Sequence, residues 1–127
     1  MKKILSAILA CVLVLGCVFA LASCGGPNKD PEAAKAALED AGYTVYLRTE
    51  GLGDDYEAQL SATKKNDDGS YEMISIVYCT SAAVAKANLA DAKEAIELAG
   101  DEADGYSAGQ SGTVVWMGTD AAIKAAK

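Results

Sequence analysis

Residues 56–79 read YEAQLSATKK, NDDGS and YEMISIVYC, and this stretch decides the fold. Apolar and polar side chains alternate over residues 56–64, which predicts a strand with one face in water. Residues 66–70 are turn formers. Residues 71–79 carry apolar side chains at positions of both parities, which is typical of a strand buried on both faces. We therefore expect this strand at the centre of a sheet, with its neighbours joined to it by hairpins.

One helix and one strand are predicted before this hairpin. Asp30 supplies an N-cap oxygen, Pro31 suits the first helical position, and Gly42 suits the left-handed end of a helix. Residues 43–48 then alternate as a strand.

A longer helix and a second hairpin are predicted after it. Thr80 or Ser81 caps a helix that extends to about residue 99. Two strands, 106–110 and 113–117, flank a two-residue turn, and a short helix ends the chain at 120–127. The long helix has an apolar stripe for the sheet, formed by Ala85, Leu89, Ala92, Ile96 and Ala99.

These elements follow in the order α-β-β-β-α-β-β-α. Segregated helices and strands of this kind predict an α+β fold, with an antiparallel sheet of four to five strands and helices packed on it.

Composition excludes several classes of function. The chain has 127 residues, 11 Lys and Arg, 18 Asp and Glu, no His and a net charge of −7. An acidic chain is a poor nucleic-acid binder, because phosphate contacts need basic residues. The absence of histidine removes Ser-His and Cys-His catalysis and every His-metal site.

The N-terminal segment has the features of a secretory signal. Lys2 and Lys3 precede a run at 4–22 that is apolar except for Ser6 and Gly16. A retained transmembrane helix is the alternative, since this run is about long enough to span a bilayer. The run ends in Leu21-Ala22-Ser23-Cys24, followed by Gly25.

These four residues resemble the lipobox of bacterial lipoproteins, and the chain's size and signal resemble those of small surface lipoproteins of Gram-positive bacteria. The resemblance implies that Cys24 is lipidated and that the signal is cleaved between Ser23 and Cys24. Two acyl chains hold a protein stably at a bilayer. The expected location is therefore the extracytoplasmic side of the cell membrane.

The expected organisation is a signal peptide at 1–23, the lipidated Cys24 with a short flexible tether at 24–29, and one small domain at 30–127. Loss of the signal with its two lysines would leave 104 residues with a net charge of −9. Repulsion from anionic lipid headgroups favours a domain that stands off the membrane surface.

Four cysteines do not predict a disulfide here. Cys11 and Cys17 are expected to leave with the signal, and the Cys24 thiol is expected to carry the lipid. Only Cys79 would then keep a free thiol. It ends a predicted strand, where Cys usually behaves as a small buried apolar residue. A reactive or intermolecular thiol is the alternative.

Acidic clusters at 54–57, 66–69 and 101–105 invite a calcium hypothesis. Neither Gly69 nor Gly105 aligns with the ligand spacing of the helix-loop-helix calcium motif, so we predict no metal site and assign the acids to turns and solubility. Paired carboxylates lack a flanking sugar-binding cleft, and no serine has a base partner. We therefore expect no catalytic residues and no cofactor.

Tyr46 and Arg48 are the remaining candidates for an interaction surface. They share one face of a strand, opposite Val45 and Leu47, and exposed Tyr and Arg are frequent interface anchors. Amphipathic side chains covering a sheet are the alternative. We expect a non-catalytic binding module. Its expected partners are the membrane, through the N-terminal lipid, and a protein of the cell envelope. A second hypothesis is an inhibitor or accessory subunit of an exported enzyme or transporter.

Overall fold

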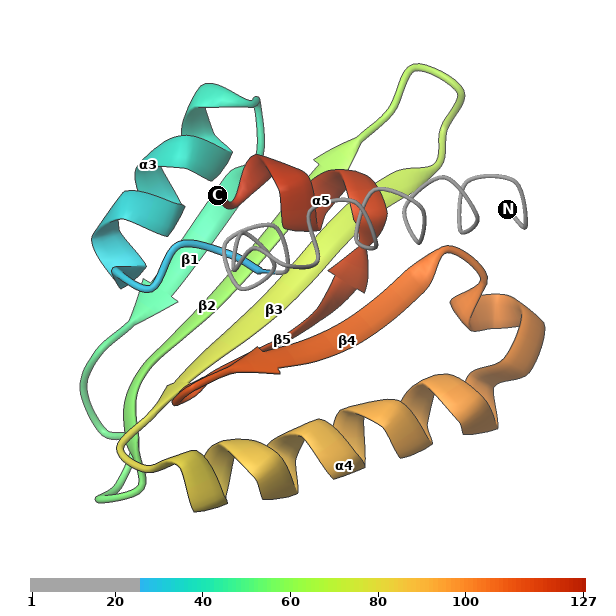
Figure 1. The fold of residues 1–127 in the computed structure, drawn as a ribbon. Coiled ribbons are helices and arrows are strands. Elements are labelled where there is room, and N and C mark those ends of the chain that lie inside the picture. Colours follow the sequence, from blue (N-terminus) through green and yellow to red (C-terminus); the bar gives the residue numbers. More distant parts are fainter. Residues whose placement is uncertain (1–25) are drawn as a thin grey trace, which may run out of the picture.

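The computed structural model describes residues 26–127. It confirms the predicted α+β fold, a five-stranded antiparallel sheet with helices packed on it (Figure 1). The elements are α3 (Pro31–Asp40), β1 (Thr44–Arg48), β2 (Tyr56–Lys65), β3 (Tyr71–Cys79), α4 (Ala82–Ala99), a 3-10 turn η1 (Gly100–Ala103), β4 (Tyr106–Ser111), β5 (Val114–Thr119) and α5 (Asp120–Ala125). Apart from the 3-10 turn, their order is the expected one.

Helices α3 and α4 begin with the side-chain caps that the sequence indicated, whereas the Thr119 side chain does not cap α5. The Asp30 carboxylate accepts a hydrogen bond from the Glu32 amide at 3.1 Å, and the Ser81 hydroxyl accepts one from the Val84 amide at 3.2 Å. The Lys64 ammonium donates to the Ala41 carbonyl oxygen at 2.9 Å, where a positive charge complements the end of α3.

The sheet order is β1-β2-β3-β5-β4, so β3 is the central strand, as predicted. We expected hairpins to join β3 to both of its neighbours. This is correct for β2 and wrong for β5. A five-residue turn joins β2 to β3, whereas β5 returns to β3 only after α4 and β4. Helix α4 carries the chain to the outer edge, and the β4–β5 hairpin then fills the position beside β3.

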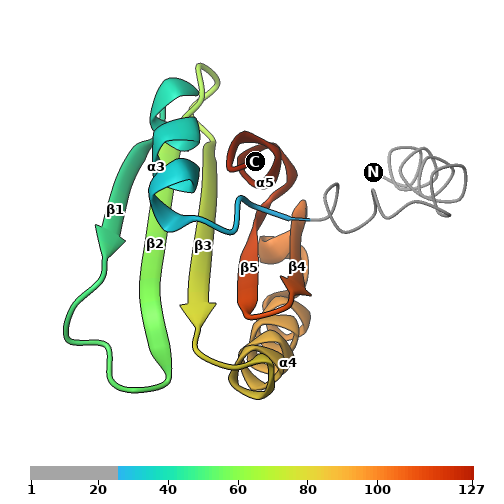
Figure 2. The same ribbon diagram turned by 60° about the vertical axis from the view of Figure 1, so that its left-hand side comes forward.

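The two faces of the sheet are covered by different helices (Figure 2). Helices α3 and α5 lie on one face, which we call the core face, and α4 lies on the other, which we call the α4 face. The register brings one apolar row across the core face, formed by Leu47, Leu60, Ile76 and Trp116, with Gly109 at the β4 end. This row and the buried residues of α3 and α5 form the main core.

Helix α4 packs less closely than its apolar stripe predicts. Of its 18 residues only Ala85 is buried, whereas Leu89, Ala92 and Ile96 are half-buried and Ala99 is exposed. The helix contacts β3, β4 and β5. Its alanine side chains are short and the sheet twists away beneath a straight helix, so only the first turns come close enough for full burial.

Residues 26–28 cross the core face and are held there. The Asn28 amide donates to the Ala126 carbonyl oxygen at 2.8 Å, and the Tyr78 hydroxyl donates to the Asn28 carbonyl oxygen at 2.9 Å. Gly26 lies against the indole of Trp116, so close that a Cβ built on Gly26 would be 2.4 Å from the ring carbon Cη2. We call residues 26–28 the N-terminal latch.

The latch changes the expected picture of a flexible tether at 24–29, since its described residues are bound to the domain. Gly26 and Pro27 are buried, and they cover the part of the core face at β4 and β5 where Trp116 lies. The Trp116 ring also lies over Gly109, where a Cβ would approach it to 2.5 Å. Burial of this ring offsets part of the conformational entropy that the three-residue segment loses when it is ordered.

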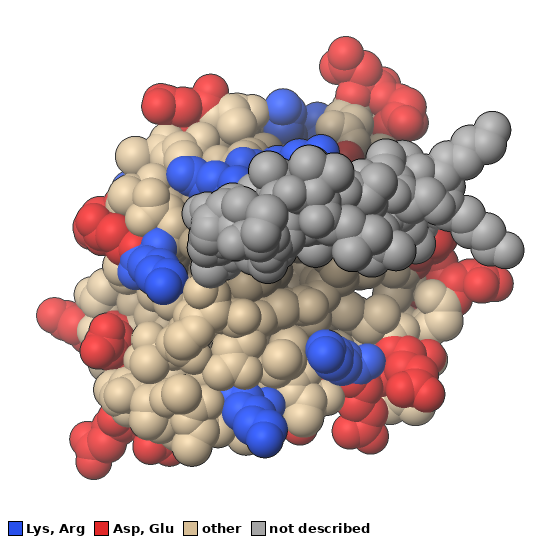
Figure 3. All heavy atoms as spheres, in the orientation of Figure 1, with Lys and Arg blue, Asp and Glu red and all other residues tan. Residues whose placement is uncertain are grey.

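Charges are unevenly distributed over the surface. On the side seen in Figure 3, which carries α5 and α4, basic side chains lie over these helices and acidic side chains gather towards the rim. Among the described residues, Lys29 follows the latch directly and Lys124 lies in α5, and both are exposed.

Candidate functional site

The α4 face is only partly covered, which leaves one half of it accessible. Helix α4 lies mainly over β3, β4 and β5 and meets β2 at its first residue, where Asn88 donates to the Tyr56 hydroxyl. We call the uncovered half the open sheet face. It is formed by side chains of β1, β2 and β3 that alternate with core residues: Thr44, Tyr46, Arg48, Gln59, Ser61, Thr63, Lys65, Tyr71, Met73 and Ser75.

The register arranges these side chains in cross-strand rows. Tyr46 is opposite Ser61, and Ser61 is opposite Ser75 on the next strand. A second row places Thr44 opposite Thr63, which is opposite Met73. Residues paired in this way lie on the same face with their Cβ atoms about 5 Å apart. The result is a surface of hydroxyl groups with the rings of Tyr46 and Tyr71 and the Met73 thioether exposed among them.

Tyr46 and Arg48, the two residues predicted as an interaction surface, are both exposed on this face. Tyr46 has 69% of its surface accessible. The Arg48 guanidinium donates to the carbonyl oxygens of Glu50 and Gly51, at 3.2 and 3.1 Å. Arg48 therefore holds the start of the β1–β2 loop, which leaves Tyr46 as the more available of the two side chains.

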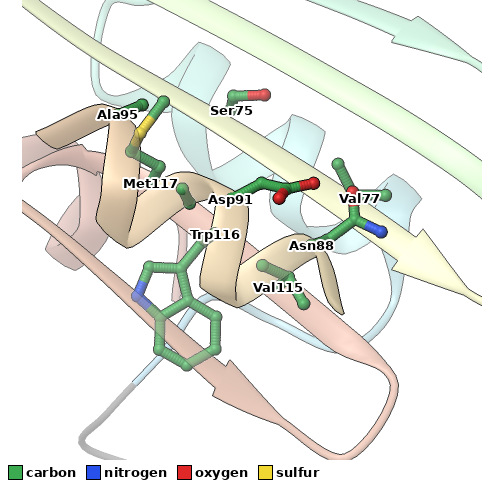
Figure 4. Close-up of a pocket in the computed structure, with 9 residues that line it drawn as sticks. Ser75, Val77, Asn88, Asp91, Ala95, Val115, Trp116 and Met117 are labelled. Carbon is green, nitrogen blue, oxygen red and sulfur yellow. The ribbon is translucent and has the colours of Figure 1, made fainter. Parts of the chain in front are cut away.

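A groove of about 260 Å³ lies where the sheet meets α4 (Figure 4). Its floor comes from β3 and β5 and its wall from the exposed middle of α4. The lining residues are Ser75, Val77, Asn88, Asp91, Ala92, Ala95, Val115, Trp116 and Met117. Ser75 belongs to both the groove and the open sheet face, so the two form one continuous surface.

The groove combines an apolar floor with a few polar groups. The Asn88 amide group donates to the Val84 carbonyl oxygen at 2.9 Å and to the Tyr56 hydroxyl at 3.2 Å, so its donors are occupied. Asp91 is an exposed carboxylate on the wall, and in Figure 4 it lies towards the β3 side of the groove. Such a groove suits an apolar side chain with a donor group beside it.

Cys79 lies beside the groove rather than in it. It is buried with 1% of its surface accessible, as predicted, and it is the free cysteine of the described residues. Burial raises the pKa of its thiol, and the negative charge of Asp55 adds to this effect. A raised pKa lowers the thiolate fraction, which is the reactive form.

Two of the acidic clusters lie in the β2–β3 turn and around η1. Asp68 accepts hydrogen bonds from the Ser70 amide at 2.9 Å and the Ser70 hydroxyl at 2.6 Å, which lower the pKa of its carboxyl group. The stretch at 101–103 is part of η1. Among residues 26–127, no three His, Cys, Asp or Glu side chains are arranged to hold a metal ion.

The predicted lipidation and cleavage residues, Ser23 and Cys24, lie outside the described residues, as does the signal at 1–23. In residues 26–127 there is no helix with both the length and the apolar character needed to cross a membrane.

Sequence reasoning did not bring together the groove residues or the latch. Ser75, Asn88 and Met117 lie on three separate elements, and none belongs to a motif. They meet only because β5 pairs with β3 and α4 lies above both. The Gly26–Trp116 contact spans almost the whole described chain, so no local pattern indicated it.

Comparisons of the chain with protein-family models, with curated proteins and with solved structures gave no match. What the domain does must therefore be inferred from its own residues and geometry.

Proposed function

We propose that this protein is a lipid-anchored extracytoplasmic lipoprotein whose domain binds a protein partner through the open sheet face. The anchoring part is supported by the basic residues 2–3, the apolar run at 4–22 and the lipobox-like Leu21-Ala22-Ser23-Cys24. The binding part is supported by the open sheet face, and it involves no catalysis.

The observation that carries the binding proposal is the exposure of Tyr46 and Met73 on a sheet face without a helix over it. Tyr46 is 69% accessible and Met73 is 40% accessible, and uncharged hydroxyl side chains lie between them. Interfaces are enriched in tyrosine and methionine and depleted of charge at their centres. The adjoining groove adds an apolar pocket that can receive one anchoring side chain.

We expect the substitution Cys24→Ala to abolish lipidation. The thiol of Cys24 is the acceptor in the proposed modification, and alanine offers no nucleophile. Cells fed an alkyne fatty acid should label the native protein, and labelled protein should fall to background in the variant. Cys79→Ala is the matched control, because that thiol is buried, and it should keep its label. Label that persists in Cys24→Ala would contradict lipidation at this residue.

We expect a photoreactive benzoylphenylalanine at position 46 to cross-link a cell-envelope protein in intact cells. The replacement keeps an aromatic ring where the native ring is exposed. Position 67, in the exposed β2–β3 turn, is the control site. A discrete adduct at 46 that is at least several-fold stronger than at 67 supports the proposal, and equal yields at both positions contradict it. An exported enzyme or transporter in the adduct would assign the chain as its inhibitor or accessory subunit.

A further inference from the structure

We infer that the N-terminal latch fixes the orientation of the domain on the bilayer, with the core-face side turned to the lipid headgroups and the open sheet face turned away from the membrane. This inference rests on the proposed lipidation of Cys24. It assigns a membrane-contacting surface to the side of the molecule that carries the latch and α5, with the lipid bilayer as its partner.

The first step is the short distance from the lipid to the latch. Cys24 and Gly26 are two residues apart, so their Cα atoms are separated by at most about 7 Å. The headgroup layer of one leaflet is about 5 to 8 Å thick. A lipid on Cys24 would therefore hold Gly26 at the level of the headgroups or just above them.

The second step is that residues 26–28 are held against the domain, so they do not act as a flexible linker. The latch makes two backbone-directed hydrogen bonds through Asn28, one with Ala126 and one with Tyr78, and a packing contact between Gly26 and Trp116. These three contacts reach β3, β5 and the end of α5, so they fix the chain against the sheet in more than one direction. A free linker of the same length would leave the domain to rotate.

The third step is which surface then meets the bilayer. The latch lies on the core face, so the core-face side is turned towards the membrane and the α4 face away from it. Tyr46, Ser61 and the other side chains of the open sheet face belong to the α4 face. They are thereby presented to the extracytoplasmic space, where a partner protein can reach them.

Two exposed lysines bear on how charge acts in this orientation. The mature chain carries a net charge of −9, which predicts repulsion from an anionic surface when the charge is treated as uniform. Lys29 follows the latch directly and Lys124 lies in α5, and both are exposed, as are Asp30 and Asp120. Lysines within a Debye length of anionic headgroups are attracted to them, which offsets part of this repulsion.

The inference is tested with the full lipidated protein in vesicles of phosphatidylglycerol and phosphatidylcholine (3:7) that contain a headgroup nitroxide quencher. Ala121→Cys places a fluorophore on the exposed side of α5, and Ser61→Cys places one on the open sheet face. Native Cys79 is buried and is left in place. We expect quenching at least threefold stronger at 121 than at 61, and equal or reversed quenching would overturn the inference.

Two further variants separate the latch from the tether. Gly26→Val should push the chain off Trp116, and a six-residue Gly-Ser insertion between Gly25 and Gly26 should lengthen the tether and leave the latch bound. Both should shrink the difference between positions 121 and 61, and circular dichroism should show that both remain folded. An unchanged difference in both variants would overturn the role of the latch.

The same samples distinguish failure of this inference from failure of the proposed function. Lipidated protein partitions into the detergent phase of Triton X-114. Recovery of the protein in the aqueous phase would contradict lipidation, and it would also overturn the orientation, which depends on the lipid. A protein that partitions but is quenched alike at both positions overturns the orientation alone.

Discussion

Trp116→Ala is expected to lower the free energy of unfolding by about 3 to 5 kcal/mol, which is the usual cost of removing a buried aromatic ring. Trp116 is 6% accessible and completes the apolar row that Leu47, Leu60 and Ile76 form across the core face. The space for the ring exists because Gly26 and Gly109 have no side chains. Alanine would leave this space as a cavity and would remove the surface on which the latch packs.

The measurement is urea unfolding of the chain produced from Gly25 onward, followed by circular dichroism because the variant lacks its tryptophan. Trp116→Phe should lower the free energy of unfolding by less than half as much, since a smaller ring still fills part of the space between Gly26 and Gly109. Met73→Ala, on the exposed face of the same sheet, should change stability by no more than about 0.5 kcal/mol. A loss below about 1 kcal/mol for Trp116→Ala would show that the latch and the ring do not pack as described.

Gly118→Ala is expected to cost about 3 kcal/mol, at the upper end of what overpacking costs in protein cores. A Cβ at this position would lie 2.5 Å from the Met73 carbonyl oxygen and 2.7 Å from the Ile74 Cα. Both atoms belong to the backbone of β3, which pairs with β5 at this point. The methyl group cannot be accommodated by a rotamer change, so the two central strands must move apart.

A matched glycine separates this steric effect from backbone strain. Gly69, in the β2–β3 turn, has a φ of +90°, and a Cβ added to it would have no atom within 4 Å. Gly69→Ala should therefore cost about 1 to 2 kcal/mol from its left-handed conformation alone. Urea unfolding of the two variants side by side is the measurement. Equal losses would mean that β3 and β5 are not as close at Gly118 as the structure places them.

Local pattern was sufficient for most of the secondary structure. The alternation in β2 and the turn formers after it identify the β2–β3 hairpin, and the Asp30 and Ser81 caps mark the helix starts within one or two residues. The apolar residues of both parities in β3 correctly indicated a central strand. These features depend on side-chain direction and backbone hydrogen bonding within a few residues, which the sequence displays directly.

Local pattern failed where a contact depends on elements far apart in the chain. The stripe on α4 predicted a helix packed on the sheet, and α4 does contact β3, β4 and β5, but Ala85 is its only buried residue and a groove is left beside its middle. The exposure of Tyr46 and Arg48 followed from strand alternation alone. Whether a helix would cover them depended on where α4 crosses the sheet, which strand alternation does not encode.

The sequence by itself determined the lipobox-like segment, the acidic and histidine-free composition, and the α+β order of helices and strands, because each is a property of neighbouring residues. Only the tertiary structure decided that β5 lies beside β3, that half of the α4 face is open, and that Gly26 packs on Trp116. Each of these depends on how elements that are distant in the chain meet in space. Residues 26–28 belong to the segment 24–29 that was expected to be a flexible tether because of its glycine and proline, but Gly26 packs on the ring of Trp116 and Asn28 bonds to Ala126 and Tyr78.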